Sequence, residues 1–337
     1  MRAGIAGASG YLGAELMRLS AGHPVFEVVV AQGDSSAGVK VAELYPNLAP
    51  GYRDLSFSPL DPAGFDGLDV VFCALPSGRS QDLVPALTDS VPLVVDLGAD
   101  FRLRDPSLYP VWYGFEHRAP ELLGRFVYGL PELFRHELVD AKLVAAPGCY
   151  VTAATIALAP LVREGLIEPT GVIVDAASGT SGAGRSPSAT THHPVANESF
   201  SAYALVSHRH TPEMEQAIGA RILFTAHLAP MTRGILATCY GRAVDGRAGS
   251  HALEALQEAY EDEPFVRVSA APCSTRDTYG SNTVQVTARY DNRTGYVVSL
   301  AALDNLVKGG AGQAVQAANL ALGLEETLGL PTIGLAP

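Results

Sequence analysis

The chain has 337 residues, 47% of them hydrophobic and 17% charged, which is long enough for two globular domains and too apolar for a disordered protein. The net charge of −12 argues against a nucleic-acid partner, because binding a phosphate backbone requires a basic surface. Cysteines occur only at positions 73, 149, 239 and 273, and the first residues lack the apolar run of a signal peptide. We therefore expect a reduced, cytoplasmic protein without a metal site.

The first predicted elements are typical of a dinucleotide-binding fold. An apolar strand over 2–6 is followed directly by "GASGYLG" at 7–13 and then by a helical pattern. Glycines in such a turn allow the backbone to approach a phosphate, and the helix N-terminus attracts a pyrophosphate. The spacing is GxxGxxG, a relative of the usual fingerprint, and an ordinary tight turn is the alternative. The residues assigned to the cofactor here are Gly7, Ser9, Gly10, Tyr11 and Gly13.

The second strand, over 26–32, ends in a loop that bears on the choice of cofactor. Asp34 can accept a hydrogen bond from a ribose 2′-hydroxyl, which favours NAD. Ser35 and Ser36 can donate to a 2′-phosphate, which favours NADP. A polar loop without a role in binding is the third interpretation, and the residues alone leave the choice open.

Three further apolar runs, at 68–78, 91–101 and 141–148, predict strands of the same sheet. Continuous rather than alternating apolar residues indicate strands buried on both faces, as in a doubly wound parallel sheet of Rossmann type. Residues 143–162 carry no charge, which raises the question of a membrane span. Pro147, Gly148 and Pro160 interrupt this stretch, so we interpret it as strand, turn and buried helix.

The second half of the chain differs in character. Its strands are predicted at 171–178, 222–230, 234–244, 265–271, 281–291 and 295–303. Their partial alternation and longer spacing indicate an α+β domain with a mainly antiparallel sheet. An amphipathic stretch at 312–330 predicts a final helix that packs on the first domain. The predicted domains are 1–148 with about 306–337, for the cofactor, and 149–305, for catalysis and oligomerisation.

Cys149 stands where a strand passes into a helix, in "AAPGCYV". A helix N-terminus favours the thiolate, which is the nucleophilic form, and its N–H groups can hold an oxyanion. A buried structural cysteine is the alternative, and it is the interpretation we give to Cys73 and Cys239 within apolar strands. His208 and His210, in "SHRHTPE" before a helix capped by Thr211, are candidate proton partners. The rival pair, His192 and His193, lies in a polar loop.

A dinucleotide loop and an activated thiol together point to one chemistry. The thiolate attacks an acyl carbon, the thioester accepts a hydride from a nicotinamide, and a histidine handles the proton. A cofactor-free cysteine acyltransferase or hydrolase would leave the glycine loop unexplained. A dinucleotide-binding regulator without activity would leave the cysteine and histidine unexplained.

Ten motifs occur in a characteristic order, among them "GASGYLG", "ALPSG", "DLGADFRL", "APGCYVTAA", "SGTSGAGR", "HRHTPE" and "DNLVKGGAGQAVQ". With this order, nearly the whole chain resembles the N-acetyl-γ-glutamyl-phosphate reductases, the arginine-biosynthesis branch of the semialdehyde dehydrogenases. The resemblance implies NADPH-dependent reduction of N-acetyl-γ-glutamyl phosphate to the semialdehyde with release of phosphate. It also implies a Rossmann domain, an α+β domain, and a homodimer or homotetramer. Aspartyl or aminoadipyl phosphate are the substrates of the nearest rival families.

The resemblance also assigns roles to single residues. Cys149 matches the nucleophile and His210 the acid/base residue, while Asn305 would reach the nicotinamide amide. The substrate's phosphate and carboxylate are expected to meet arginines and a hydroxyl inside shared motifs. The substrate residues assigned are His208, Arg209, Arg102, Arg185 and Ser178, and the remaining cofactor residues are Pro76, Gly78 and Gly182. The sequence departs from the family's usual pattern at Asp34, where an arginine is common, and at Ser77, where a histidine is common.

Overall fold

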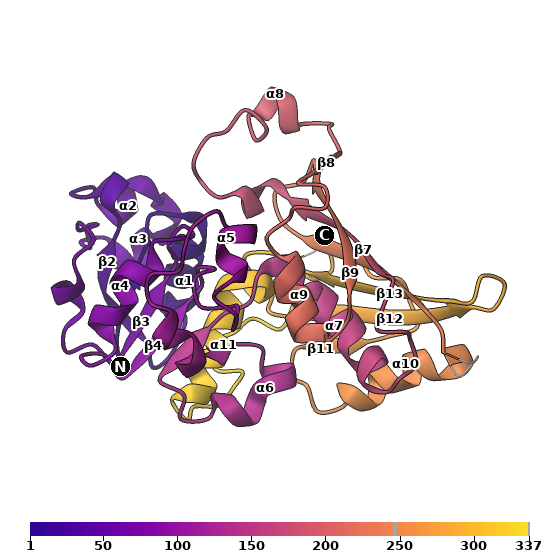
Figure 1. Cartoon of the computed structure of the whole chain (residues 1–337). Coiled ribbons are helices and arrows are strands. Elements are labelled where there is room, and N and C mark those ends of the chain that lie inside the picture. Colours follow the sequence, from indigo (N-terminus) through magenta and orange to yellow (C-terminus); the bar gives the residue numbers. More distant parts are fainter. Residues whose placement is uncertain (245–247, 336–337) are drawn as a thin grey trace. The chain divides into compact units, whose positions relative to one another are not determined.

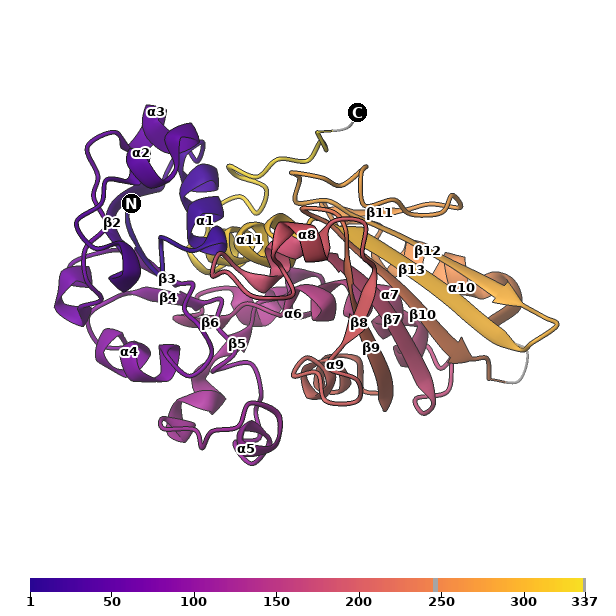
Figure 2. The ribbon, with the colours of Figure 1, turned by 90° about the horizontal axis from the view of Figure 1, so that it is seen from above.

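The structure is a computed structural model that describes residues 1–244 and 248–335. It divides into two compact units (Figures 1 and 2). The amino-terminal unit comprises Met1–Pro147 and Gly310–Leu330. The carboxyl-terminal unit comprises Gly148–Gly309 and the stretch that begins at Pro331.

A six-stranded sheet forms the centre of the amino-terminal unit. Its strands, in spatial order, are β2 (Glu27–Gln32), β1 (Arg2–Ala6), β3 (Val70–Cys73), β4 (Leu93–Asp96), β6 (Leu143–Ala145) and β5 (Val127–Tyr128). Every pair is parallel, and β3 and β4 are buried along their whole length. The predicted doubly wound parallel sheet is therefore confirmed. The two-residue strand β5 was not predicted, because so short a segment carries no periodic signal.

Helices and short turns connect these strands. The helices of this unit are α1 (Tyr11–Ala21), α2 (Val41–Leu44), α3 (Ala49–Tyr52), α4 (Ser80–Leu87), α5 (Leu108–Trp112), α6 (Pro131–Leu138) and α11 (Gly312–Ala321). The 3₁₀ turns are η1 (Asp34–Ser36), η2 (Pro46–Leu48), η3 (Pro62–Phe65) and η4 (Pro120–Arg125). Helix α11 follows a π-helical turn, η6 (Val307–Ala311), and packs against α6, β4 and α1. Helix α11 therefore belongs to the amino-terminal unit.

A seven-stranded sheet forms the carboxyl-terminal unit. Its strands, in spatial order, are β11 (Val266–Val268), β12 (Val284–Asp291), β13 (Tyr296–Leu303), β10 (Ile235–Arg242), β7 (Val172–Gly179), β9 (Ile222–Ala229) and β8 (Ser201–Tyr203). Two pairs, β7 with β9 and β11 with β12, are parallel, and the others are antiparallel. The predicted mainly antiparallel sheet is confirmed. Strand β8 at the sheet edge was not predicted.

Helices pack against one face of this sheet. The helices of the unit are α7 (Cys149–Arg163), α8 (His193–Ala196), α9 (Thr211–Ile218) and α10 (Ala248–Ala259), and η5 (Thr180–Ala183) is a 3₁₀ turn. Helix α7 contacts β10, β12 and β13, α10 contacts β11 and β12, and Figure 2 shows both helices on the same side of the strands. The expected interruption at Pro160 was wrong: α7 continues through Pro160 to Arg163. Twelve of its residues are buried, so packing outweighs the backbone bond that proline removes.

The last described residues belong to the carboxyl-terminal unit, whereas the sequence placed them with the first domain. The Asn282 N–H donates to the Pro331 carbonyl at 2.7 Å, and the Thr283 hydroxyl donates to the Thr332 carbonyl at 2.9 Å. These bonds join a segment without periodic pattern to the start of β12, which sequence patterns do not predict. Within the described ranges, no helix has the length and apolar character needed to span a bilayer.

Candidate active site

Cys149 is the first residue of α7. Strand β6 ends at Ala145, and Gly148 caps the helix with extended backbone angles (φ −68°, ψ 146°) and no side-chain cap. The first helical bond runs from the Thr152 N–H to the Gly148 carbonyl at 2.9 Å. The N–H groups of the first turn therefore have no acceptor within the helix, and they surround the partly exposed thiol with partial positive charge.

The other three thiols lie in different surroundings. Cys73 and Cys239 are fully buried, as predicted for core residues. Burial raises the pKa of both thiols, and it raises the pKa of Cys273 to about 11. These three side chains therefore remain protonated at neutral pH.

His210 lies directly beside the residue that precedes Cys149. A Cβ atom on Gly148 would stand 2.6 Å from His210 Nε2 and 2.9 Å from its Cδ2, so only glycine leaves space for the ring. Both His210 and Gly148 are buried. Helix α9 begins one residue earlier than predicted, with His210 rather than Thr211 at its N-cap.

Glu213, in the first turn of α9, fastens this helix to the start of α7. Its Oε1 atom accepts a hydrogen bond from the Gly148 N–H at 2.9 Å, and the side chain is fully buried. Two residues of one short helix, Glu213 and His210, thus fix the turn that carries Cys149. The contact between Glu213 and Gly148 depends on a fold that brings residues 65 positions apart together.

His208 has a different environment from His210. Its ring meets Tyr150, Tyr203 and Phe224 edge-on, with centroids 5.0–5.6 Å apart. Its Nδ1 atom accepts from the His210 N–H at 3.1 Å. Burial, and secondarily Arg209, lower the pKa of His208 to about 4. His208 is therefore neutral at pH 7 and holds the backbone of His210 in place.

Two tyrosines that the sequence did not single out complete the surroundings of Cys149. The Tyr150 hydroxyl donates to the His227 carbonyl at 2.8 Å, and the Tyr203 hydroxyl donates to the Tyr150 oxygen at 3.2 Å. Burial raises the pKa of both, and the Cys149 charge adds to the effect. Tyr150 was identifiable only as the neighbour of the thiol, while Tyr203 comes from the unpredicted strand β8.

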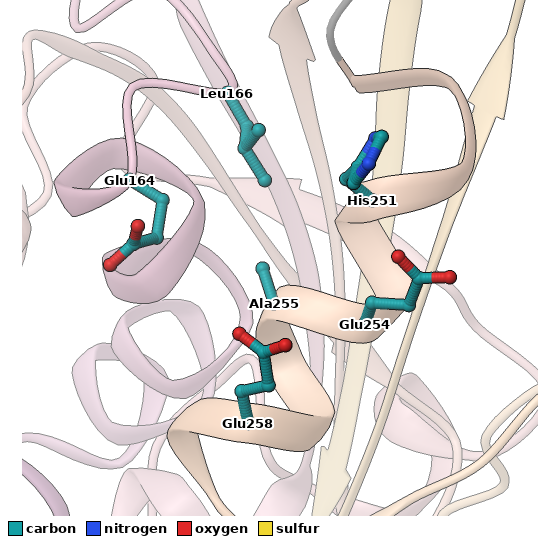
Figure 3. A pocket seen from close by; sticks show the side chains of 6 residues that line it. All are labelled: Glu164, Leu166, His251, Glu254, Ala255 and Glu258. Carbon is teal, nitrogen blue, oxygen red and sulfur yellow. The ribbon is translucent and has the colours of Figure 1, made fainter.

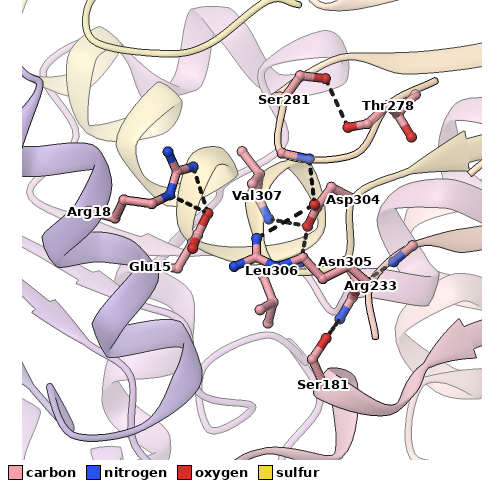
Figure 4. Close-up of polar contacts among 12 residues, drawn as sticks. Glu15, Arg18, Ser181, Arg233, Thr278, Ser281, Asp304, Asn305, Leu306 and Val307 are labelled. Atoms are coloured by element: carbon pink, nitrogen blue, oxygen red, sulfur yellow. Dashed lines mark hydrogen bonds and ion pairs between the residues drawn. The ribbon is translucent and has the colours of Figure 1, made fainter. Parts of the chain in front are cut away.

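The turn after β13 also reaches Cys149. A Cβ atom on Gly309 would stand 2.9 Å from the Cys149 Cβ, and the Gly309 N–H donates to the Asp304 carbonyl at 2.9 Å. The buried Asp304 carboxylate accepts from the N–H groups of Gly280, Leu306 and Val307, and pairs with Arg233 at 3.6 Å (Figure 4). This network makes the turn rigid. It also gives the Arg233 guanidinium an ion-pair partner, the Asp304 carboxylate.

Asn305, assigned to the nicotinamide, lies in the same turn. Its Oδ1 accepts from the Gly234 N–H at 2.7 Å, and its Nδ2 donates to the Ser181 hydroxyl at 3.0 Å (Figure 4). A Cβ on Gly182 would approach Ser178 Oγ to 2.9 Å and Asn305 Nδ2 to 3.6 Å. The structure thus brings together Ser178 and Gly182, predicted from one motif, and Asn305, predicted from another.

The three predicted substrate arginines have unlike surroundings. Arg209 is exposed and lies near His208 and Tyr203, whose pKa values its charge lowers. Arg185 is partly exposed in the loop after η5. Arg102 is buried in the amino-terminal unit, where its guanidinium donates to the carbonyls of Ala146 and Leu97 at 2.8 and 2.7 Å. These bonds give Arg102 a structural function at the ends of β4 and β6.

The glycine loop of the amino-terminal unit fits a dinucleotide. A Cβ on Gly7 would stand 2.3 Å from the Ala74 carbonyl oxygen, and one on Gly13 would stand 2.4 Å from the Gly7 oxygen. These two glycines are required by packing. A Cβ on Gly10 would meet only the Gly7 oxygen, at 3.5 Å, and Gly10 caps α1 without a side-chain bond. The start of α1 is therefore open to a ligand's phosphates, next to the exposed Tyr11.

The remaining cofactor candidates surround this loop. Ser9 is buried against Gly33 at the end of β2, with its Oγ 2.7 Å from the Cβ position of that glycine. Ser35 is exposed and Ser36 buried in η1. Pro76 is exposed after β3, and the Gly78 N–H donates to Asp100 at 2.6 Å.

One hollow of about 360 Å³ lies elsewhere in the carboxyl-terminal unit, between the end of α7 and helix α10 (Figure 3). It is lined by Glu164, Leu166, His251, Glu254, Ala255 and Glu258. None of the residues predicted for catalysis, substrate or cofactor lines it. Across residues 1–244 and 248–335, no cluster of three or more potential ligands is arranged to hold a metal ion.

Two family models match the chain. The NAD-binding domain of semialdehyde dehydrogenases matches residues 2–141, and the dimerisation domain of semialdehyde dehydrogenases matches residues 149–305. The second match begins at Cys149 and ends at Asn305, two residues predicted to belong to the site.

Relatives and solved structures agree with these matches. The chain is 46% identical to the N-acetyl-γ-glutamyl-phosphate reductase of Symbiobacterium thermophilum, over 99% of this chain and 98% of the relative. It is 47% identical to that of Acidothermus cellulolyticus, over 100% and 99%. The fold resembles aspartate semialdehyde dehydrogenase II from Vibrio cholerae (TM-score 0.70, 17% identity, covering 96% and 98%). It also resembles the Candida albicans aspartate semialdehyde dehydrogenase solved with NADP (TM-score 0.69, 15% identity, covering 95% and 97%).

Proposed function

The chain belongs to the semialdehyde dehydrogenase family, in its N-acetyl-γ-glutamyl-phosphate reductase branch, and we propose that it catalyses the reaction of that branch. The reaction is reduction of N-acetyl-γ-glutamyl phosphate to N-acetylglutamate 5-semialdehyde, with NADPH as hydride donor and phosphate as leaving group. It is a step of arginine biosynthesis. The observation that carries the proposal is the position of Cys149 at the start of α7, with His210 packed on Gly148.

The first half of the reaction depends on Cys149. Its thiolate attacks the γ-carbonyl carbon, and the N–H groups of the first turn of α7 stabilise the negative oxygen that forms. The C–O bond to phosphate then breaks, phosphate leaves, and a thioester on Cys149 remains. The turn held by Glu213 keeps the thiol at a fixed distance from these N–H groups.

The second half needs a proton donor. When bound, the nicotinamide cofactor supplies a hydride to the thioester carbon. His210 donates a proton to the resulting oxygen and recovers it as the C–S bond breaks and the aldehyde leaves. His208, neutral and bonded to the His210 N–H, positions that ring without titrating near neutral pH.

A nicotinamide cofactor follows from the family's NAD-binding domain, and NADPH is the finer proposal. The open Gly10 and the uncapped start of α1 support binding of the pyrophosphate. Ser35 and Ser36 are the hydroxyl donors available to a 2′-phosphate, and Asn305 with Gly182 would hold the nicotinamide end. We assign Ser9, Tyr11, Pro76 and Gly78 to the remaining contacts.

The substrate's anionic groups are assigned to exposed cations of the carboxyl-terminal unit. Arg209 stands beside the histidines and is exposed, and Arg185 follows the glycine-rich turn that holds Ser178. Both can form the bidentate contacts that carboxylate and phosphate favour. Arg102 is the weakest of the assignments, because two of its donors already bind carbonyl oxygens.

The match to a dimerisation domain supports a homo-oligomer, and we propose a homodimer or homotetramer built on the seven-stranded sheet. The sheet face opposite α7 and α10 carries partly exposed apolar side chains in adjoining strands, among them Ile173, Tyr240, Val298 and the 52% exposed Leu223. A second copy would bury this face. Light scattering after size-exclusion chromatography measures the oligomeric state. Leu223→Glu should favour the monomer, because it places a charge on the face that a second copy would bury.

Reduction of aspartyl or aminoadipyl phosphate is the second candidate function. The neighbours among solved structures are aspartate semialdehyde dehydrogenases, but at 17% identity and below they share only the fold. The relatives at 46–47% identity over the full chain favour the acetylglutamyl substrate. A cofactor-free acyltransferase would leave the glycine loop of β1 and α1 without a function.

The reverse reaction tests the proposal. Purified protein is mixed with N-acetylglutamate 5-semialdehyde and NADP, and NADPH absorbance is followed with and without phosphate. We expect reduction of NADP that requires phosphate and that Cys149→Ser abolishes. Activity with aspartate semialdehyde, and none with the acetylated substrate, would assign the protein to the rival branch.

A further inference from the structure

Two loops of the amino-terminal unit meet beside the glycine loop. Strands β2 and β3 flank β1 in the sheet, and their carboxyl ends lead into η1 and into the turn before α4. Arg79, at the N-cap of α4, places Nη2 3.5 Å from the Asp34 Oδ2 in η1. The loop after β3 thus supplies a cation to the loop after β2, where an adenosine ribose lies in folds of this type.

The position of Asp34 is fixed, and it adjoins the phosphate cradle. Asp34 Oδ1 accepts from the Leu60 N–H at 2.8 Å. The preceding residue, Gly33, lies against Ser9 of the glycine loop, and the N–H groups of Gly7 and Ala8 donate to the Gln32 carbonyl at 2.8 Å. The Asp34–Arg79 pair therefore stands at the edge of the same cradle that the pyrophosphate would occupy.

Two arginines, Arg79 and Arg118, lie near the start of α4, and their ion pairs differ in geometry and strength. Arg118 donates to both carboxylate oxygens of Asp82 at 2.7 Å and to the Gly78 carbonyl at 2.6 Å. This chelate lowers the pKa of Asp82, with a smaller contribution from Arg79. Arg79 has its ion pair with Asp34, and the two side chains are 55% and 58% exposed. An exposed pair of this length contributes at most about 1 kcal/mol, so a stronger anion can replace Asp34.

We infer that Arg79 binds the 2′-phosphate of the cofactor and sets the preference for NADPH over NADH. The inference rests on the proposed function and identifies the cation that the Asp34 loop lacks. A phosphate monoester carries roughly two negative charges and accepts bidentate bonds from a guanidinium, which makes it a better partner than one carboxylate. Ser35 and Ser36 add hydroxyl donors on the same loop. In the protein without cofactor, the Asp34 carboxylate keeps the Arg79 guanidinium in position. When the cofactor is bound, the negative charge of Asp34 repels the 2′-phosphate.

The test compares binding of paired ligands to Arg79→Gln. NADPH and NADH are titrated by fluorescence, and 2′,5′-ADP and 5′-AMP by calorimetry, so that binding is measured without catalysis. We expect Arg79→Gln to lower the affinity for NADPH and 2′,5′-ADP by roughly 10- to 100-fold. The affinity for NADH and 5′-AMP should change less than about twofold. Arg79→Lys should show an intermediate loss of NADPH affinity, because lysine keeps the positive charge but cannot form the bidentate contact of a guanidinium. Asp34→Asn should strengthen NADPH binding a few-fold.

Controls separate the possible outcomes. Arg53→Gln removes an exposed cation of the same unit and should leave the NADPH-to-NADH ratio unchanged. If wild-type protein binds NADPH and Arg79→Gln binds it equally well, the inference is overturned and the proposed function stands. An equal loss of NADPH and NADH would also overturn it, since the effect would not concern the phosphate. Wild-type protein that binds neither cofactor would overturn the proposed function as well.

Discussion

Each of the two compact units contains a helix that follows a glycine N-cap without a side-chain cap, α1 after Gly10 and α7 after Gly148, yet the two helix N-termini differ in what surrounds them. The start of α1 is open: Gly10 has only the Gly7 oxygen within 4 Å of its Cβ position. The start of α7 is enclosed: His210 packs on Gly148, and Glu213 accepts its N–H. An open terminus suits a cofactor that must enter and leave in each turnover, whereas an enclosed terminus suits a covalent intermediate that must stay oriented.

The largest difference between the two termini should appear on removing the thiol. Cys149→Ala is expected to lower kcat by at least about a thousandfold, because no other group can form the thioester. NADPH affinity, which depends on the start of α1, should change less than about twofold. Steady-state kinetics and fluorescence titration measure the two quantities. A comparable loss of NADPH affinity would show that the termini do not have separate functions.

Replacement of the proton donor should have the next largest effect. His210→Asn is expected to reduce kcat by about 10²- to 10⁴-fold, the usual contribution of general acid–base catalysis. Alkylation of Cys149 by iodoacetamide, followed at several pH values, reports on the thiolate itself. The variant should shift that profile if His210 contacts the thiol. An unchanged profile together with unchanged kcat would assign His210 a structural role.

A matched pair of substitutions compares the two termini directly. Gly148→Ala places a methyl group 2.6 Å from the His210 ring and should lower kcat by roughly 10- to 100-fold through displacement of that ring. Gly10→Ala adds a methyl group that meets only the Gly7 oxygen, at 3.5 Å, so it should leave kcat nearly unchanged. Because the methyl group lies where the cofactor's phosphates would bind, the affinity for NADPH should fall roughly tenfold. The opposite pattern would reverse the functions given to the two termini.

The smallest expected effect is a difference in pH dependence between the units. The pKa of His208 is lowered to about 4, so its stabilising contribution at neutral pH is lost as pH falls from about 6.5 to 4. The buried Asp96 at the end of β4 has its pKa raised to about 7, by burial and then by Asp100, so stability is lost as pH rises from about 4 to 7.

Each contribution should amount to roughly 1–3 kcal/mol of unfolding free energy. His208→Gln is expected to reduce the loss of unfolding free energy in acid, and Asp96→Asn is expected to reduce the loss of unfolding free energy near neutral pH. Urea unfolding at pH 4.5, 6 and 7.5 measures both. Parallel curves for wild type and variants would contradict the assigned pKa shifts.

The sequence by itself determined the elements whose signal is local. Apolar strands, the glycine loop at 7–13 and the Pro147-Gly148 turn before Cys149 predicted both sheets and both helix N-termini, because periodicity and glycine act over a few residues. Local signals failed for β5 and β8, which are two and three residues long. They failed also at Pro160, where burial of α7 outweighs the helix-breaking tendency of proline.

Tertiary structure alone decided which side chains meet. His210 and Glu213 reach Gly148, the neutral His208 packs on Tyr150, and Arg79 lies beside Asp34, all across separations of more than 40 residues. Such contacts depend on how sheets are ordered and how helices pack on them, which no short pattern encodes. The sequence therefore predicts which residues are able to do chemistry, and the packing of the fold decides which of them lie close enough to do it together.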